Sequence, residues 1–257
     1  MPDLSIVATS GKHLTLGIIP ARWASSRFPG KPLHPIAGKP LVQHVWERCQ
    51  QCTQLDDAVI ATDDDRIYQA AIAFGAKAVM TSTHHLTGTD RIAEAADALA
   101  QDGQDASYII NIQGDEPLID PSLIDQLALA LHADSGVSMA TAANAITDET
   151  LIFDPNVVKC ALALNGDALY FSRSPLPYRR SESPELKIFR HKGIYAYRRD
   201  FLKKFITWPP SPLEVAESLE QLRALENNAR IKVLITEDES PGVDTLEQAQ
   251  YIESLLR

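Results

Sequence analysis

Four basic residues lie close together in the segment 16–39, and no acidic residue lies among them. They are Arg22, Arg27, Lys31 and Lys39. The chain as a whole has a formal net charge of -10, so a cationic loop in this setting indicates a specific anionic ligand. Arg22, Arg27 and Lys31 together can offset most of the charge of a triphosphate. The alternative is a solvated basic loop, and the loop lacks the G-x-x-x-x-G-K-[ST] spacing of a Walker motif.

Two acidic residues are candidates for binding a metal ion. Asp115 lies in the sequence NIQGDEP, which follows an apolar run, and Asp244 lies in GVDT, just before a segment with helical periodicity. Mg²⁺ takes oxygen ligands and usually binds through one or two carboxylates together with substrate phosphates, so both residues suit it. Helix capping remains an alternative for each: Asp115 in a turn before the next helix, and Asp244 as the N-cap of the last helix.

Three other groups resemble reactive sites, but each has a plainer interpretation. His84 and His85 are adjacent and point in different directions, and no third zinc ligand has suitable spacing. Cys49 and Cys52 have C-x-x-C spacing but fall in the late turns of a predicted helix, which does not suit a redox motif. The acidic run 63–65 contains a D-x-D pattern, although its place at a helix start favours capping.

The elements that must position these residues follow a repeating strand and helix order. Short apolar runs predict strands, and segments with a period of 3.6 residues predict helices. The predicted strands are 14–19, 58–61, 78–80, 108–112 and 137–142. One predicted helix begins at Leu41, and three others cover 64–74, 90–100 and 121–132. This order predicts an α/β fold with a Rossmann-like, mostly parallel sheet flanked by helices. Ligands bind beyond the carboxyl ends of such strands, where the basic loop and Asp115 are expected.

The section from about 156 to 198 departs from this order. It contains β-rich runs at 157–164, 168–172 and 193–197, and Asn165-Gly166 between the first two predicts a hairpin. Helical patterns return at 200–206 and 213–227, followed by a strand at 231–235 and a helix at 245–256. We therefore predict a single domain, 1–257, with a β-rich insertion at about 156–198.

Composition limits the class of protein. With 257 residues and 45% hydrophobic composition, the chain can bury a full core. A sequence pI near 5.1 argues against broad binding to nucleic acid or anionic membranes. No apolar stretch approaches the ~20 residues of a spanning helix, and the first 15 residues lack the hydrophobic region of a signal peptide. Three cysteines are too few for a disulfide framework, which favours a cytoplasmic location.

The sequence IIPARWASSRFPGKPLHPIAGKPLVQHVWER resembles the nucleotide-binding start of the 3-deoxy-manno-octulosonate cytidylyltransferases, or CMP-Kdo synthetases. The similarity continues in the family's order through TGTDR, INIQGDEP, ALYFSRSPLP, RHKGIYAYR, SPLEVAESLEQLR and GVDT. It covers nearly the whole chain after Leu14. The first motif alone indicates the wider sugar nucleotidyltransferase group, and the later motifs make the resemblance specific.

This resemblance implies a fold of the nucleotide-diphospho-sugar transferase type and a homodimer built on the β-rich insertion. It implies transfer of a cytidylyl group from CTP to the anomeric hydroxyl of Kdo, giving CMP-Kdo and pyrophosphate for lipopolysaccharide biosynthesis. The implied cofactor is Mg²⁺. Catalysis is then expected to come from alignment of the sugar oxygen with the α-phosphorus and from cationic stabilisation of the developing charge.

The resemblance also implies roles residue by residue. The implied metal ligands are Asp115 and Asp244, which with Arg22 and Lys31 form the catalytic set. The implied triphosphate ligands are Arg22, Arg27 and Lys31, and the implied cytidine contacts are Ala21, Gly88, Arg91 and Gln113. The implied sugar contacts are Gln113, Arg173, His191, Tyr195, Glu214 and Gln221. Two plainer roles stay open, a surface ion pair for Arg173 and a place in the sheet core for Tyr195.

Rival functions differ in features that can be checked in the sequence. An enzyme that activates sialic acid should lack HKGIYAY and SPLE, and a silent nucleotide-binding module would be favoured by loss of a metal acid. A fold-related glycosyltransferase would rely on a D-x-D motif, for which only the run 63–65 qualifies. A cytidylyltransferase for an amino-substituted Kdo analogue or another 2-keto acid sugar remains an alternative.

Overall fold

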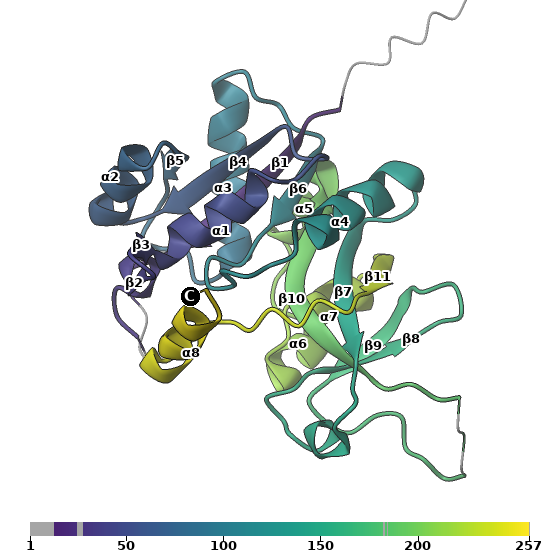
Figure 1. Cartoon of the computed structure of the whole chain (residues 1–257). Coiled ribbons are helices and arrows are strands. Elements are labelled where there is room, and N and C mark those ends of the chain that lie inside the picture. The colour runs from purple at the N-terminus through teal and green to yellow at the C-terminus, as the bar shows by residue number, and fades with distance from the viewer. Residues whose placement is uncertain (1–12, 25–27, 182, 184, 257) are drawn as a thin grey trace, which may run out of the picture.

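The computed structural model describes residues 13–24, 28–181, 183 and 185–256. Its centre is a nine-stranded sheet whose main path runs in the order β11-β7-β10-β6-β1-β4-β5 (Figure 1). The strands of this path are β1 (Thr15–Ala21), β4 (Asp57–Thr62), β5 (Lys77–Met80), β6 (Tyr108–Asn111), β7 (Met139–Ala145), β10 (Phe189–Arg198) and β11 (Ile231–Ile235). The hairpin strands β8 (Lys159–Leu162) and β9 (Ala168–Ser172) branch from β10. A separate small ribbon pairs β2 (Pro35–Ile36) with β3 (Lys39–Pro40).

Most neighbouring strands on the main path are parallel, as the strand and helix order predicts. β1 pairs in parallel with both β4 and β6, and β11 pairs in parallel with β7. β10 is antiparallel to β6 and β7, between which it lies. The predicted mostly parallel α/β sheet is therefore confirmed. Because β1 and β6 run side by side in the same direction, the basic loop after β1 and the NIQGDEP sequence after β6 emerge at one edge of the sheet.

Helices cover both faces of the sheet. The α-helices are α1 (Leu41–Cys49), α2 (Asp65–Ala73), α3 (Gly88–Gln101), α4 (Pro121–Ala133), α5 (Arg199–Phe205), α6 (Pro212–Glu217), α7 (Gln221–Glu226) and α8 (Leu246–Leu256), and the 3₁₀ helices are η1 (Lys31–Leu33) and η2 (Glu149–Ile152). Among the described residues, no helix is both long and apolar enough to cross a bilayer.

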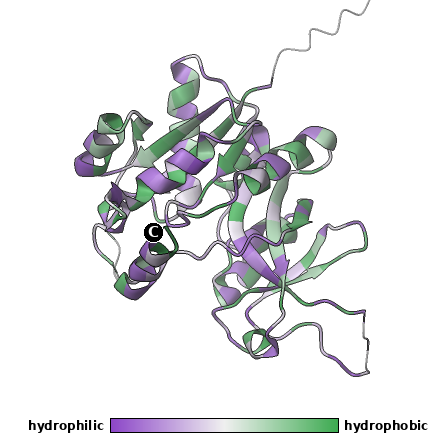
Figure 2. Ribbon diagram, viewed as in Figure 1, coloured by the Kyte–Doolittle hydropathy of each residue, from purple (hydrophilic) through white to green (hydrophobic). Residues whose placement is uncertain are grey.

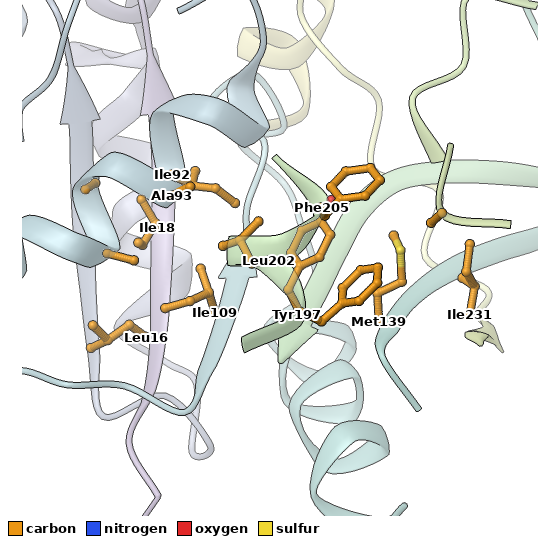
Figure 3. Packing of buried hydrophobic residues seen from close by; sticks show 14 of the residues in the cluster. Leu16, Ile18, Ile92, Ala93, Ile109, Met139, Tyr197, Leu202, Phe205 and Ile231 are labelled. Carbon is orange, nitrogen blue, oxygen red and sulfur yellow. The ribbon is translucent and has the colours of Figure 1, made fainter. Parts of the chain in front are cut away.

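Alternation along the strands divides the core packed on the main sheet into two clusters. In β1, Leu16 and Ile18 pack with α3, α5 and α7, whereas Ile19 and Ala21 pack with α1, α2 and α4. Figure 3 shows the first cluster, which extends from Leu16 and Ile18 across the sheet toward Tyr197. The hydropathy colours of Figure 2 agree, since the central strands are mostly hydrophobic and the helices carry hydrophilic outer faces. The sheet is thus a rigid platform that fixes where its loops emerge.

Two boundaries expected from the sequence are confirmed, the start of the helix predicted at 121–132 and the hairpin turn at Asn165-Gly166. Asp120 caps α4 by accepting a hydrogen bond from the Ser122 amide, and the Asn165-Gly166 turn joins β8 to β9. One prediction is wrong: the helical segment 213–227 is two short helices, α6 and α7. The break falls at Ser218, whose positive φ of 51° ends α6.

The β-rich section 156–198 contributes to two places in the fold. Its first part forms the β8–β9 hairpin, which projects from the sheet (Figure 1). Its last part is β10, which lies inside the main sheet between β6 and β7. Residues of β10 are therefore held next to the loop after β6.

Candidate active site

A cavity of about 310 Å³ opens where β1 and β6 end. The first turn of α3 and the segment before α8 complete it. Its lining residues are Pro20, Ala21, Arg22, Lys31, Pro32, His85, Leu86, Thr87, Gly88, Arg91, Gln113, Gly114, Asp115 and Asp244. Every residue predicted for the nucleotide and the metal is in this set except Arg27, which lies outside the described residues. The structure thus gathers into one cavity groups that are far apart in the sequence.

The cationic wall comes from the loop between β1 and η1. Arg22 is exposed at the cavity, and the Lys31 side chain retains only 14% of its accessible surface. The two ends of the loop are joined, because the Gly30 amide donates to the Trp23 carbonyl at 3.1 Å. Trp23 is itself fixed, since the Arg66 guanidinium lies 3.4 Å from the centroid of its ring.

Only glycine fits at position 30. Its φ is +71°, and a Cβ there would lie 2.9 Å from the ring of Trp23. A left-handed backbone and the close approach of the indole both exclude larger residues. Gly30 therefore lets the loop close tightly enough to direct Lys31 toward the cavity.

The acidic wall brings Asp115 and Asp244 together around Lys31. The Lys31 ammonium is 2.6 Å from Asp115 Oδ2 and 3.1 Å from Asp244 Oδ1. The backbone joins the same two segments, because the Val243 amide donates to the Asp115 carbonyl at 2.8 Å. The loop after β6 also lies tightly on β1, since a Cβ at Gly114 would be 2.8 Å from the Pro20 carbonyl oxygen. The two carboxylates and the lysine form one compact group.

Other side chains occupy the capping positions that were alternatives for these two acids. Asp120, not Asp115, caps α4. At α8 the Thr245 hydroxyl accepts a hydrogen bond from the Gln248 amide at 3.3 Å. Asp244 Oδ1 is then within reach of Lys31, as noted above. The geometry thus favours the ligand-binding interpretation of both acids over capping.

The donor set of this wall suits a hard cation. Two carboxylates with space for substrate phosphates are the arrangement that Mg²⁺ uses. Among the described residues, no group of three or more histidine, cysteine, aspartate or glutamate side chains could hold a metal on its own, so the His84–His85 pair gains no support as a zinc site. The C-x-x-C pair is equally unsuited to redox chemistry, since Cys49 is buried and burial raises the pKa of Cys52 to about 12.

The far end of the cavity combines small residues with one buried cation. Ala21 and Gly88 leave room, and Arg91 is only 2% exposed. Its guanidinium donates to Asp63 Oδ2 at 2.6 Å and to Thr81 Oγ1 at 2.5 Å. Asp63 is therefore occupied by Arg91, and its neighbour Asp64 caps α2. Asp63 and Asp64 therefore bind groups of the protein itself, which does not suit a D-x-D metal motif. The capping role preferred from the sequence for the run 63–65 is confirmed at Asp64.

The predicted sugar contacts fall into two groups, and the first lies beside the cavity. Gln113 lines the cavity, and its amide donates to the Gly193 carbonyl of β10 at 2.6 Å. On β10, the rings of His191 and Tyr195 are 5.4 Å apart. Burial lowers the pKa of His191 to about 3 and raises the pKa of Tyr195, so both side chains are neutral near pH 7.

The second group of predicted sugar contacts is engaged elsewhere. The Arg173 guanidinium donates to the carbonyls of Pro155, Glu217 and Ser218. The Glu214 carboxylate accepts from Arg223 at 2.7 and 2.8 Å and from the Ser211 amide. This completes a capping box at the start of α6, and the spacing S-x-x-E could have indicated it. Gln221 differs, because its buried Nε2 has no hydrogen-bond partner among the described residues.

One further cluster, which no sequence pattern indicates, lies behind the acidic wall. Lys192 of β10 contacts Asp238 and Glu116, and all three side chains are largely buried. Burial raises the pKa of Glu116 to about 7. His85 was also missed as a lining residue; it contacts Glu94. Its position just before the TGTDR motif was the available signal.

Comparisons with known proteins agree with this geometry. A family model described as Cytidylyltransferase matches residues 16–231. The chain is 51% identical to the 3-deoxy-manno-octulosonate cytidylyltransferase of Solibacter usitatus, over 94% of each chain. It is also 51% identical to that of Geobacter sulfurreducens, over 89% of this chain and 93% of the relative.

Solved structures show the same relation. CMP:2-keto-3-deoxy-manno-octonic acid synthetase complexed with CTP superposes with a TM-score of 0.89 at 42% identity, covering 95% of this chain and 98% of that one. A 4-diphosphocytidyl-2C-methyl-D-erythritol synthase shares the fold alone, with a TM-score of 0.66 at 13% identity. The chain therefore belongs to the 3-deoxy-manno-octulosonate cytidylyltransferase family.

Proposed function

We propose that this protein transfers a cytidylyl group from CTP to the anomeric hydroxyl of Kdo, releasing pyrophosphate. The observation that carries the proposal is the meeting of Lys31 with Asp115 and Asp244 at 2.6 and 3.1 Å, beside the basic loop. This group combines cations for a triphosphate with carboxylates for its metal ion. Membership of the family supports CTP as the nucleotide and Kdo as the acceptor.

The cations of the loop would bind the triphosphate of CTP. Arg22 is exposed at the cavity and forms no ion pair with any described residue, so it is available to phosphate oxygens. Lys31 would exchange its carboxylate partners for phosphate when nucleotide enters. This exchange keeps the lysine paired in both states, which limits the cost of its partial burial. We assign Arg27 to the same clamp, as the sequence predicts.

The cytidine would lie deeper in the cavity, over Ala21 and Gly88. Arg91 is held in place by Asp63 and Thr81, so its position is set before the nucleotide binds. Gln113 stands between the nucleotide cavity and β10 through its bond to Gly193. We place it at the junction of the two substrates, where its side-chain oxygen can accept from either.

Mg²⁺ fits the donor set of Asp115 and Asp244, and we propose these two residues as its protein ligands. When bound, the ion supplies Lewis-acid stabilisation of phosphate charge and lowers the pKa of a coordinated hydroxyl. The chain's own contribution is to hold the two carboxylates together through the Val243–Asp115 backbone bond. Positioning and electrostatics would then provide most of the catalysis.

The sugar acid would lie along β10, near His191 and Tyr195. A neutral imidazole and a phenol suit the hydroxyls of Kdo. Among the described residues, the Arg173 guanidinium donates to carbonyls and pairs with no carboxylate, so its positive charge can attract the Kdo carboxylate. Gln221 offers a buried side-chain nitrogen, Nε2, that has no hydrogen-bond partner among the described residues. We favour Gln221 over Glu214 as a sugar contact, because Glu214 is fully occupied by Arg223 and Ser211.

Pyrophosphate release tests the proposal directly. Each of the four nucleoside triphosphates is incubated with Kdo or its amino-substituted analogue, with and without Mg²⁺. We expect release only with CTP, a sugar and Mg²⁺, and the faster sugar identifies the acceptor. Release that does not depend on the sugar, or turnover with another nucleotide at an equal rate, would refute the proposed reaction.

We further propose a homodimer in the cytoplasm. Apolar side chains on and beside the hairpin are exposed, which favours a partner on this surface. They are Phe153, Leu164, Leu169 and Tyr178. Light scattering on the purified protein should give twice the chain mass, and Leu169→Glu should shift it toward one chain. A reducing compartment suits the three cysteines, all of which are free thiols.

A further inference from the structure

We propose that Lys192 is a positioning residue that holds the two segments carrying Asp115 and Asp244 in register for metal binding. The inference rests on the proposed function, because it assumes that these two aspartates bind the metal ion. Lys192 lies in HKGIYAY on β10 and does not line the substrate cavity. Its effect on the reaction would pass through other residues.

The Lys192 ammonium connects two separate segments of the chain. On one side it donates to the Asp238 carbonyl and to Ser240 Oγ, both at 3.1 Å, and it lies 3.1 Å from Asp238 Oδ2. On the other side it lies 4.0 Å from Glu116 Oε2. Asp238 and Ser240 belong to the segment that leads to Asp244, and Glu116 directly follows Asp115. One ammonium is therefore shared between the supports of both proposed ligands.

The cluster is buried, so its contacts are not weakened by solvent. The side chains of Lys192 and Asp238 are each 7% exposed, and that of Glu116 is 14% exposed. Glu116 Oε2 has no hydrogen-bond partner among the described residues, so the ammonium is the nearby cation that compensates it. Burying charged groups is costly unless they pair, and a neutral apolar cluster would stabilise the fold at least as well. The charge is better explained by positioning than by stability.

The backbone around Lys192 is also fixed. The register of β10 against β7 shifts between Lys192 and Tyr195. Thr141 of β7 stabilises this irregularity, since its hydroxyl lies 3.1 Å from the Lys192 carbonyl and 2.7 Å from the Ile194 carbonyl. Bulges of this kind commonly redirect a side chain beside an active site. Here the irregularity adjoins the Gly193 carbonyl that holds Gln113.

The test measures how strongly metal binding and nucleotide binding are coupled. The dissociation constant of CTP is determined by calorimetry with and without Mg²⁺, in the absence of sugar, and the ratio of the two values reports the coupling. Outer-shell partners of metal ligands typically change metal affinity by about 10- to 100-fold. We therefore expect Lys192→Met to reduce the ratio at least ~10-fold while leaving the metal-free affinity for CTP nearly unchanged.

A matched control lies on the same strand. Arg198, at the other end of β10, donates to the carbonyls of Leu131, Asp134 and Val137. Arg198→Met should destabilise the fold yet leave the coupling ratio as in the wild type. Ser240→Ala removes one acceptor of Lys192 and one donor to Asp238 Oδ2 but removes no charged side chain, and we expect a loss of up to ~5-fold. It provides the measurement if Lys192→Met does not fold.

The outcomes separate the inference from the proposed function. A wild-type ratio near one, or a ratio unchanged in Asp115→Asn, overturns the metal assignment and the inference with it. If Asp115→Asn abolishes the coupling but Lys192→Met and Ser240→Ala retain it, the metal assignment stands and Lys192 is only structural. Equal losses in Lys192→Met and Arg198→Met would also overturn the inference.

Discussion

Two regions of this molecule use their polar groups in different ways. We call the cavity at the ends of β1 and β6 the nucleotide side, and β10 with α6 and α7 the sugar side. Around the cavity, Lys31, Asp115 and Asp244 pair with one another and can exchange those partners for a ligand. Around α6 and α7, Glu214 and Arg223 are bound to each other and to the backbone. In the first arrangement, a triphosphate and a metal ion can replace the partners of the charged groups. In the second, the charged groups hold two helices together.

This difference teaches how to interpret a charged residue in a motif. A charge that contacts other charges at the open ends of strands is available for chemistry, because incoming ligand can replace its partners. A charge that closes a capping box and a buried pair cannot leave without exposing an uncompensated partner. Membership of a shared motif therefore does not give Asp115 and Glu214 the same kind of role.

Replacement of a carboxylate on the nucleotide side should give the largest effect. Asp115→Asn keeps the size of the side chain but removes its charge. We expect kcat to fall at least ~10²-fold, on the scale of losing a key electrostatic group. Steady-state pyrophosphate release at saturating CTP and Mg²⁺ measures the change. Near-normal turnover would remove Asp115 from the metal site and with it the basis of the comparison.

On the sugar side, Glu214→Gln should mainly reduce stability. The substitution weakens the pair with Arg223, while Glu220 remains 3.1 Å from that guanidinium. We expect the free energy of unfolding to fall by about 2 kcal/mol, with the KM for Kdo unchanged. Denaturant unfolding and sugar titrations provide the two measurements. A raised KM with unchanged stability would instead support the sequence-based assignment of Glu214 to the sugar. Gln221→Ala is the companion variant, for which we expect the reverse pattern.

The nucleotide side was the more predictable from sequence, for a physical reason. Its residues follow strands directly, and parallel strands deliver their carboxyl ends to one edge, so Asp115 and the basic loop could be placed together. The signals were local, since the basic loop directly follows β1 and the NIQGDEP sequence directly follows β6. The meeting of Asp244 with Asp115 was the one long-range step, and the resemblance to the family supplied it.

The rest could not be predicted because it depends on pairings between distant segments. Nothing local marks Lys192 as the partner of Asp238. The periodicity of a β-strand predicts which face a lysine lies on, but it does not predict which buried acid the lysine will contact. The break at Ser218 was missed for a similar reason. Apolar periodicity runs through 213–227 and does not show the left-handed conformation of Ser218 that divides α6 from α7. A tertiary contact lies next to this break, the bond from Thr89 to Glu220.

A smaller effect should follow from reshaping the basic loop rather than removing its charge. Gly30→Ala places a Cβ at 2.9 Å from the Trp23 ring in a left-handed backbone. We expect a loss of about 1.5 kcal/mol in unfolding free energy together with a raised KM for CTP. Gly38→Ala is a matched control, because that residue also has a positive φ, of 83°, but its Cβ would meet nothing within 4 Å. Equal effects of the two variants on the KM for CTP would show that the Trp23 contact does not shape the site.

The smallest effect concerns the neutral imidazole on the sugar side. The pKa of His191 falls from 6.5 to about 3 on folding because the ring is buried, so the unfolded chain binds a proton first as the pH drops. Its contribution to stability is therefore full above about pH 6.5 and is lost toward pH 3.

Glu116 acts in the opposite direction in part of this range. Its pKa rises from 4.5 to about 7, so its contribution is present below pH 4.5 and is lost as the pH rises through 7. A pH profile of the wild type alone therefore mixes the two groups, and a variant is needed to isolate His191. His191→Gln suits this purpose, because an amide can still donate to Thr141 Oγ1, which lies 2.9 Å from the imidazole Nε2. Relative to the wild type, this variant should gain about 1 kcal/mol between pH 7 and pH 5.5, as measured by denaturant unfolding at each pH. Parallel curves for the two proteins would mean that His191 is protonated as readily in the folded state as in the unfolded chain, and that burial does not keep its imidazole neutral.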